Sequence, residues 1–232
     1  MQIKMYQKED YPVSNWSGGK TTQLFIYPEN SEYAKRNFLF RISSATVECE
    51  RSEFTSLPGV DRVILPLKGS LHLFYEGYGE KVLAPYEQDR FDGGWNTVSV
   101  GKATDFNLML REGTKGEVEV HPLQTQESLC LQNDDSMMLV FVAEGNVCLD
   151  EKPFDHWQLA VVDGEGKISI QNKEEKPAKV IVCRIAVNSV RHKVAQLRIL
   201  ILEDIRTVLI GAYKHICRAV NNGIVWVIHK NA

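Results

Sequence analysis

The chain has 232 residues, of which 44% are hydrophobic and 25% are charged, a composition typical of a folded globular protein rather than a disordered one. Lys and Arg number 27 against 30 Asp and Glu, and the resulting net charge is −3. This balance excludes the broad basic field of a protein that binds nucleic acid mainly through phosphates, so we expect no nucleic-acid partner.

The first ten residues, MQIKMYQKED, carry charges where a secretory signal would have an apolar run. No uncharged apolar run reaches the roughly 18 residues that span a bilayer, so we expect a cytoplasmic protein with no transmembrane segment. The five cysteines are scattered without a CxxC pair, and we expect buried thiols rather than zinc or redox chemistry.

Residues 1–187 contain many short segments in which apolar and polar side chains alternate, such as residues 38–43 and 105–111. Residues 63–67 run through a Lys68-Gly69-Ser70 turn into another such segment. No helical pattern of 10 to 15 residues separates these segments, which argues against a parallel α/β sheet. Short strands between Gly and Pro turns predict an all-β sandwich or barrel.

An internal repeat indicates two similar halves. A shift of 76 residues aligns VILPLKGSLHL (63–73) with LVFVAEGNVCL (139–149), and both segments continue to a strand that ends in an acidic residue and glycine. We predict two β-barrel or jelly-roll halves, an N-terminal one in residues 1–120 and a C-terminal one in residues 121–187.

Residues 188–232 have a different composition. All eight prolines and 14 of the 16 glycines precede them, and they carry seven Lys and Arg against two acids. Apolar residues recur every three or four positions from Val190 to Val220, so we predict a C-terminal helical extension. The sequence leaves open whether the extension packs on the β core, joins a homodimer, adheres to a membrane surface or docks a partner.

The sequence offers no clear metal site. A site between neighbouring strands needs clustered His and carboxylates, whereas the chain has no HxH or HExxH and His72 stands alone between two leucines. GxSxG, GxxxxGK[ST] and GxGxxG motifs are also absent from the sequence. We therefore expect no metal and no cofactor, and enzyme classes with strong local signatures are disfavoured.

Three polar clusters interrupt the apolar strands. In NWSGGKTTQ (15–23), Gly18 and Gly19 would let backbone N–H groups approach a ligand beside the flat wall of Trp16, or they simply form a turn. The second cluster places Arg41 inside a strand, either on a solvated face or buried with a partner.

The third cluster is DFNLMLR (105–111). Period-two geometry places Asp105, Asn107, Met109 and Arg111 on one face of a strand. This polar face either lines the interior of the β-structure or is ordinary protein surface.

The ordered motifs NWSGGKTTQL (15–24), FRIS (40–43), FTSLPGVDR (54–62), LKGSLHL (67–73), FDGG (91–94) and DFNLMLR (105–111) resemble the HutD/Ves family of bicupin proteins. The resemblance covers residues 1 to about 187. It implies a cytoplasmic double cupin and, in some members, a proposed regulatory role linked to histidine utilisation. It also implies that shared polar positions line a pocket in the N-terminal barrel: Trp16, Arg41, Arg62, Asp105, Asn107 and Arg111.

Our first hypothesis is a metal-free bicupin that binds a small anionic or amide-bearing metabolite. Arg41 and Arg111 would clamp a carboxylate, because a guanidinium offers paired donors, and Asn107 would contact an amide or carbonyl. Trp16 would pack against the carbon skeleton of the ligand, and the Gly18-Gly19 turn would offer backbone N–H donors. Asp105 would orient an arginine, and Arg62 would pair with Asp61 or Asp92 at the rim.

The alternative hypothesis is an enzyme, a cupin isomerase or hydrolase. Asp105, or His72 if it points inward, would then be the general base. The sequence alone does not decide between binding and catalysis.

Overall fold

The computed structural model describes residues 1–134 and 136–186 and shows an almost entirely β protein. The helical extension predicted for residues 188–232 lies outside the described residues. The described residues contain no helix with the length and hydropathy needed to cross a membrane. Two short 3-10 turns, η1 (Lys8–Asp10) and η2 (Tyr33–Lys35), are the helical elements of this part of the chain.

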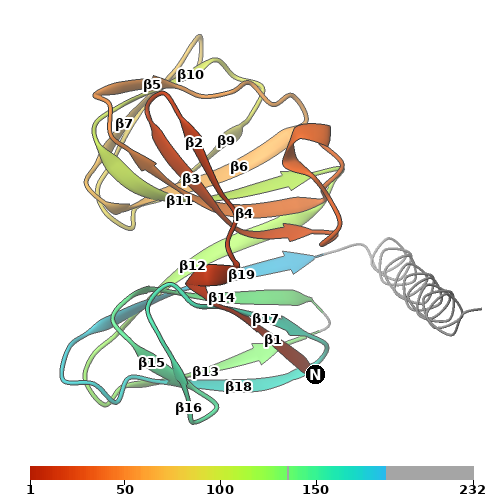
Figure 1. Ribbon diagram of the computed structural model, residues 1–232, viewed down its shortest axis with the longest axis vertical. Coiled ribbons are helices and arrows are strands. Elements are labelled where there is room, and N and C mark those ends of the chain that lie inside the picture. The colour runs from red at the N-terminus through yellow and green to blue at the C-terminus, as the bar shows by residue number, and fades with distance from the viewer. Residues whose placement is uncertain (135, 187–232) are drawn as a thin grey trace, which may run out of the picture. The chain divides into compact units, whose positions relative to one another are not determined.

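Two sheets form the first half of the fold (Figure 1). The larger sheet has six strands in the order β2 (Val13–Trp16), β3 (Gly19–Tyr27), β4 (Phe40–Val47), β11 (Ala103–Arg111), β6 (Val60–Lys68) and β9 (Asp89–Asp92). The smaller sheet has four strands in the order β5 (Arg51–Glu53), β10 (Thr97–Val100), β7 (Leu71–Tyr75) and β8 (Gly79–Leu83). Buried apolar side chains between them, including Ile64, Leu73 and Phe91, form a core cluster.

Two further sheets form the second half. The larger sheet has five strands in the order β1 (Gln2–Tyr6), β17 (Leu159–Asp163), β14 (Met137–Glu144), β19 (Ala178–Ala186) and β12 (Lys115–Leu123). The smaller sheet has four strands in the order β13 (Ser128–Asn133), β18 (Gly166–Gln171), β15 (Val147–Leu149) and β16 (Lys152–Phe154). Their facing side chains form a second core of Val, Leu, Ile, Met, Ala and Phe.

The strand order repeats between the halves. The run β4-β11-β6-β9 has the same arrangement as β12-β19-β14-β17, and β5-β10-β7-β8 has the same arrangement as β13-β18-β15-β16. Gly69 and Gly145, which the sequence repeat aligns, hold φ angles of 77° and 74° in equivalent turns. The backbone needs glycine there, since a Cβ on Gly69 would lie 2.4 Å from the carbonyl oxygen of Lys102.

The halves differ in two ways from the sequence prediction. Among the described residues the strands form four separate sheets, so each half is a pair of facing sheets, which fits the jelly-roll form of the prediction and not the closed barrel. The sheets also cross the predicted boundary at residue 120, because β1 and β12 pair with strands of the second half. The division into domains at residues 1–120, 121–187 and 188–232 stays a prediction.

The strands β4, β11 and β6 of the six-stranded sheet are largely buried on both faces. One face of β4 and β11 carries Phe40, Ile42, Phe106 and Leu108, all with 0% exposure. The ring of Phe106 lies 5.7 Å from that of Phe141 on β14, so this face packs against the second half. The other face of the same two strands carries polar residues, and it looks into the first half.

Replacing Phe106 with Ala should therefore destabilise the protein by about 3–5 kcal/mol, because it empties a buried site between the halves. Chemical unfolding of both proteins measures this difference. Val82→Ala, at a position 62% exposed, is the control and should change stability by less than about 0.5 kcal/mol. A loss below 1 kcal/mol for Phe106→Ala would contradict the packing described here.

Candidate functional site

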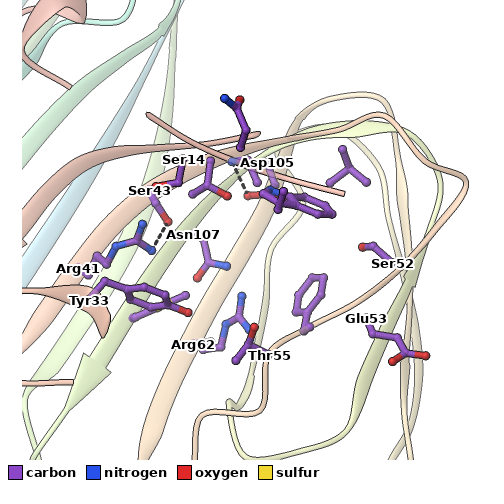
Figure 2. A pocket seen from close by; sticks show the side chains of 17 residues that line it. Ser14, Tyr33, Arg41, Ser43, Ser52, Glu53, Thr55, Arg62, Asp105 and Asn107 are labelled. Carbon is purple, nitrogen blue, oxygen red and sulfur yellow. Dashed lines mark hydrogen bonds between the residues drawn. The ribbon is translucent and has the colours of Figure 1, made fainter. Parts of the chain in front are cut away.

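A cavity of about 340 Å³ opens inside the first half. Side chains of β2, β3, β4, β5, β6 and β11 line it, together with Tyr33 of η2 and Phe54 and Thr55 after β5. Figure 2 shows Arg41, Asn107 and Arg62 projecting into the same space from three neighbouring strands. A volume of this size is at the lower end of the range for small-molecule sites.

The strand register explains why these side chains meet. On β11, Met109 is paired with Arg41 of β4 on one side and with Arg62 of β6 on the other. Asn107 lies two residues further along β11 and on the same face. The two guanidinium groups therefore flank the middle strand at one level, and the amide lies at the next level.

Arg41 is buried, with 6% exposure. Its Nε donates to Oε1 of Gln23 at 2.8 Å, one terminal nitrogen donates to Oγ of Ser43 at 3.0 Å, and its Cζ lies 4.4 Å from the ring centre of Tyr33. Burial lowers the pKa of Arg41 to about 10, which leaves the group charged at neutral pH. Arg41 is held by neutral polar and aromatic groups, and no salt bridge joins it to a carboxylate within the described ranges.

Arg62 is 5% exposed and lies over two aromatic rings. Its Cζ is 4.7 Å from the ring centre of Phe54 and 5.1 Å from that of Phe91. Its Nε is buried and has no hydrogen-bond partner in the part of the chain that the structure describes. Burial lowers the pKa of Arg62 to about 10, and the nearby Asp105 carboxylate partly offsets this effect.

Asn107 and Asp105 complete the polar face. Asn107 is 5% exposed, and its Oδ1 is a buried acceptor without a hydrogen-bond partner among the described residues. Oδ1 of Asp105 accepts a hydrogen bond from the backbone N–H of Ala45 at 3.2 Å. Burial raises the pKa of Asp105 to about 7, against the opposing effects of that hydrogen bond and of Arg62.

The hairpin of β2 and β3 lies at the rim of the cavity. Trp16 lines the cavity and remains 38% exposed. Gly18 and Gly19 do not line it, and their role is steric. A Cβ on Gly18 would lie 2.2 Å from the Trp16 ring, and one on Gly19 would lie 1.9 Å from the carbonyl oxygen of Thr46. Close packing of the hairpin explains both glycines, and backbone donation to a ligand stays a prediction for them.

The structure brings Arg62, rather than Arg111, together with Arg41. Arg111 does not line the cavity, and its Cζ lies 5.4 Å from the ring centre of Phe38. The predicted pairing of Arg62 with Asp61 or Asp92 is wrong, because Arg62 lines the cavity whereas Asp61 and its strand partner Asp92 lie on the opposite face of the sheet.

The two predicted rim partners have other contacts. Asp61 forms an ion pair with Arg90, and Oδ1 of Asp92 accepts from the backbone N–H of Gly94 at 2.7 Å. Asp105 contacts Arg62 electrostatically, and the hydrogen bond of its carboxylate goes to Ala45 instead of to an arginine.

His72 lies away from the cavity. It is on the face of β7 opposite to the buried Leu71 and Leu73, its ring is 4.0 Å from that of Phe74, and its Nε2 lies 3.1 Å from Oε2 of Glu80. His72 therefore cannot act as a general base in this cavity.

The cavity side chains do not fit a resident metal ion. They include two guanidinium groups and no histidine, and of their two carboxylates Asp105 is buried whereas Glu53 is exposed. Within residues 1–134 and 136–186, no group of three or more His, Cys, Asp and Glu could hold a metal. Positive charge at this position favours an anion.

Sequence reasoning missed two aromatic walls of the site, Tyr33 and Phe54. Phe54 belongs to the FTSLPGVDR motif of the family resemblance, but nothing in the sequence indicates that its side chain lines the site. Tyr33 lies in a short irregular segment with no periodicity, and only its position beside Arg41 in space reveals it.

The positions of the second half that are equivalent to Arg62, Asp105 and Asn107 are apolar, whereas the exposed Glu117 takes the place of Arg41. The repeat aligns Ile64 of β6 with Val140 of β14. Ile64 is paired with Asn107, and Val140 is paired with Val182, so Val182 occupies the position of Asn107. The same register places Met138 where Arg62 lies, and Val180 where Asp105 lies. All three apolar residues have 0% exposure in the second core. A half of this architecture therefore packs well without these charged and amide groups.

The comparisons with known proteins agree with this architecture. The family model described as HutD matches residues 8–179. The conserved protein PA5104 from Pseudomonas aeruginosa is 20% identical, with a TM-score of 0.69 over 81% of this chain and 100% of that one. HutD from Pseudomonas fluorescens is 21% identical, with a TM-score of 0.63 over 80% of this chain and 100% of that one.

A more distant likeness is to the pirin YhhW from Escherichia coli in complex with nickel(II). It is 12% identical, with a TM-score of 0.61 over 79% of this chain and 98% of that one. No curated protein matches the sequence. At these identities the solved structures establish a shared fold.

The raised pKa of Asp105 predicts a pH-dependent stability. A carboxyl group with a higher pKa in the folded chain than in the unfolded chain stabilises the fold below its unfolded pKa, and this contribution is lost as the pH rises to about 7. Asp105→Asn should therefore be more stable than the wild type at pH 8, by on the order of 2–4 kcal/mol, and should lose this advantage near pH 4.

Urea unfolding of both proteins between pH 4 and pH 8 measures the effect. Asp155→Asn, at an exposed position, is the matched control and should follow the wild-type curve. Parallel stability curves for Asp105→Asn and the wild type would show that Asp105 is not a buried group with a raised pKa.

Proposed function

Because the chain belongs to the HutD family, we propose that its first half binds a small organic anion in the cavity between Arg41 and Arg62. The bound metabolite acts as a signal, and the family's link to histidine utilisation makes products of amino-acid breakdown the first candidates. Such metabolites are intracellular, which agrees with the predicted cytoplasmic location. A homodimer stays a prediction.

The observation that carries this proposal is the burial of two guanidinium groups that form no salt bridge within the described ranges. Removing a charge from water costs several kcal/mol unless an opposite charge or good hydrogen bonds compensate it. Asp105 supplies one negative charge near Arg62, and the second carboxylate of the lining, Glu53, is exposed, so the buried part of the cavity holds two guanidinium groups against one carboxyl group. A carboxylate ligand would supply the missing charge and accept paired N–H donors.

The comparison between the halves supports a functional role for this charge. Met138, Val180 and Val182 fill the equivalent positions of the second half and contribute to its core. A fold that has an apolar solution for these positions does not need Arg62, Asp105 and Asn107 for stability. Polar groups that a scaffold retains against its own stability are typical of binding sites.

Aromatic side chains would enclose the carbon skeleton of the ligand. Tyr33 lies beside Arg41, Phe54 lies beside Arg62, and Trp16 stands at the rim. HutD from Pseudomonas fluorescens was determined in a formate condition. Formate is the smallest carboxylate, so it is a convenient first probe for this cavity, followed by larger planar acids.

The raised pKa of Asp105 favours a second candidate function, that of an isomerase or hydrolase. A buried carboxyl group with a pKa of about 7, in a cavity with two cations, has the properties of a general acid or base. If this candidate is right, an amino-acid catabolite will be converted by the wild type and not by Asp105→Asn. Binding without any conversion of the ligand supports the first function.

The triple variant Arg62→Met, Asp105→Val, Asn107→Val tests the binding function with residues that the second half already uses. We expect its free energy of unfolding to exceed that of the wild type by about 1–4 kcal/mol, because hydrophobic groups replace buried charges. A ligand at 100 times its dissociation constant stabilises the wild type by about 2.7 kcal/mol, and the variant should lose this gain.

Thermal unfolding with formate and with a library of amino-acid catabolites provides the measurement. Arg90→Gln, at an exposed arginine that pairs with Asp61, is the matched control and should keep the response to the ligand. Equal ligand-induced stabilisation of the triple variant and the wild type would end the proposal.

A further inference from the structure

Two unpaired atoms of opposite character belong to side chains that line the same cavity. Nε of Arg62 is a donor and Oδ1 of Asn107 is an acceptor, and both are buried without a hydrogen-bond partner in the described part of the molecule. A buried polar atom without a partner is costly, and such atoms are rare in native proteins. A ligand that compensates both atoms must present an acceptor to the arginine and a donor to the amide.

The strand register fixes the positions of the arginines and of Asn107 along β11. Arg41 and Arg62 flank β11 at the level of Met109, whereas Asn107 lies at the next level on the same face, roughly 6.6 Å along the strand. Asp105 follows at the level after that. Along β11 the cavity thus changes from two cationic donors, through an amide acceptor, to a carboxyl group.

From this arrangement we infer that the ligand is an organic anion with a hydrogen-bond donor, N–H or O–H, at the end away from its charge, and that Asn107 selects for this donor. The inference rests on the proposed function and specifies its ligand class. An anion of the same shape without the donor would leave Oδ1 of Asn107 buried and unpaired. A simple anion site would be equally well satisfied by both ligands.

The other polar groups near Asn107 do not replace the ligand donor. Ser43 pairs with Asn107 across β4 and β11, and its Oγ accepts from Arg41, but its hydroxyl makes no hydrogen bond to Oδ1 of Asn107. Ile64 is the neighbour on β6 and has no polar side-chain atom. The two strand neighbours of Asn107, a serine and an isoleucine, therefore leave its Oδ1 without a donor.

Two isosteric planar acids test the inference on the full-length wild-type protein. Pyrrole-3-carboxylate carries a ring N–H, whereas furan-3-carboxylate has a ring oxygen that only accepts. Titration calorimetry should give about 10-fold tighter binding of the pyrrole acid, the effect of one hydrogen bond to a buried acceptor. Equal affinities, or tighter binding of the furan acid, would overturn the inference.

Asn107→Val places the residue of the second half at this position, and it should bind both acids with equal affinity, mainly through loss of affinity for the pyrrole acid. Asn96→Leu, at an exposed asparagine of the same half, is the matched control and should keep the wild-type preference. A preference that survives in Asn107→Val would assign the selection to another residue.

Arg62→Gln separates the inference from the proposed function. Weaker binding of both acids by this variant supports an anion site, whether or not the wild type distinguishes the two acids. If neither acid binds to the wild type, the proposed function fails and the inference fails with it. If both acids bind equally and both depend on Arg62, the inference alone fails.

Discussion

Strand β11 is buried on both of its faces, and this constraint shapes both the fold and the site. Its apolar face, with Phe106 and Leu108, packs toward the second half, so the strand cannot turn its polar face to solvent. Asp105 and Asn107 must then lie inside the first half, next to the arginines of β4 and β6. Because buried polar groups need partners, the cavity between these strands keeps unsatisfied charge and hydrogen-bonding capacity.

The duplicated architecture separates what the fold requires from what the site requires. Both halves share a strand order and a glycine turn at Gly69 and Gly145, because those features determine how the sheets face each other. The interiors differ, with an apolar core in the second half and a polar cavity in the first. Under the proposed function, the first half uses this polar cavity for a ligand, whereas the second half packs an apolar core.

Much of this arrangement could be predicted from the sequence. Period-two alternation and the repeat marked the strands and the two halves, and the family motifs marked Arg41, Arg62, Asp105 and Asn107. Strand alternation separated a polar face of β11 from an apolar one, but it could not show that both faces are buried. It also could not show that the chain passes between the halves at β1 and β12, because these pairings join segments far apart in sequence. Tyr33 stayed hidden because it lies in a short irregular segment with no periodicity.

The central claim is that the two buried guanidinium groups exist to hold an organic anion. A crystal structure with 3-bromobenzoate tests it most directly, because anomalous scattering from the bromine locates the ring while the electron density locates the carboxylate. The account predicts a carboxylate within hydrogen-bond distance of Nε of Arg62, with the ring between Phe54 and Tyr33. Bromine signals confined to the outer surface, with water alone between Arg41 and Arg62, would contradict it.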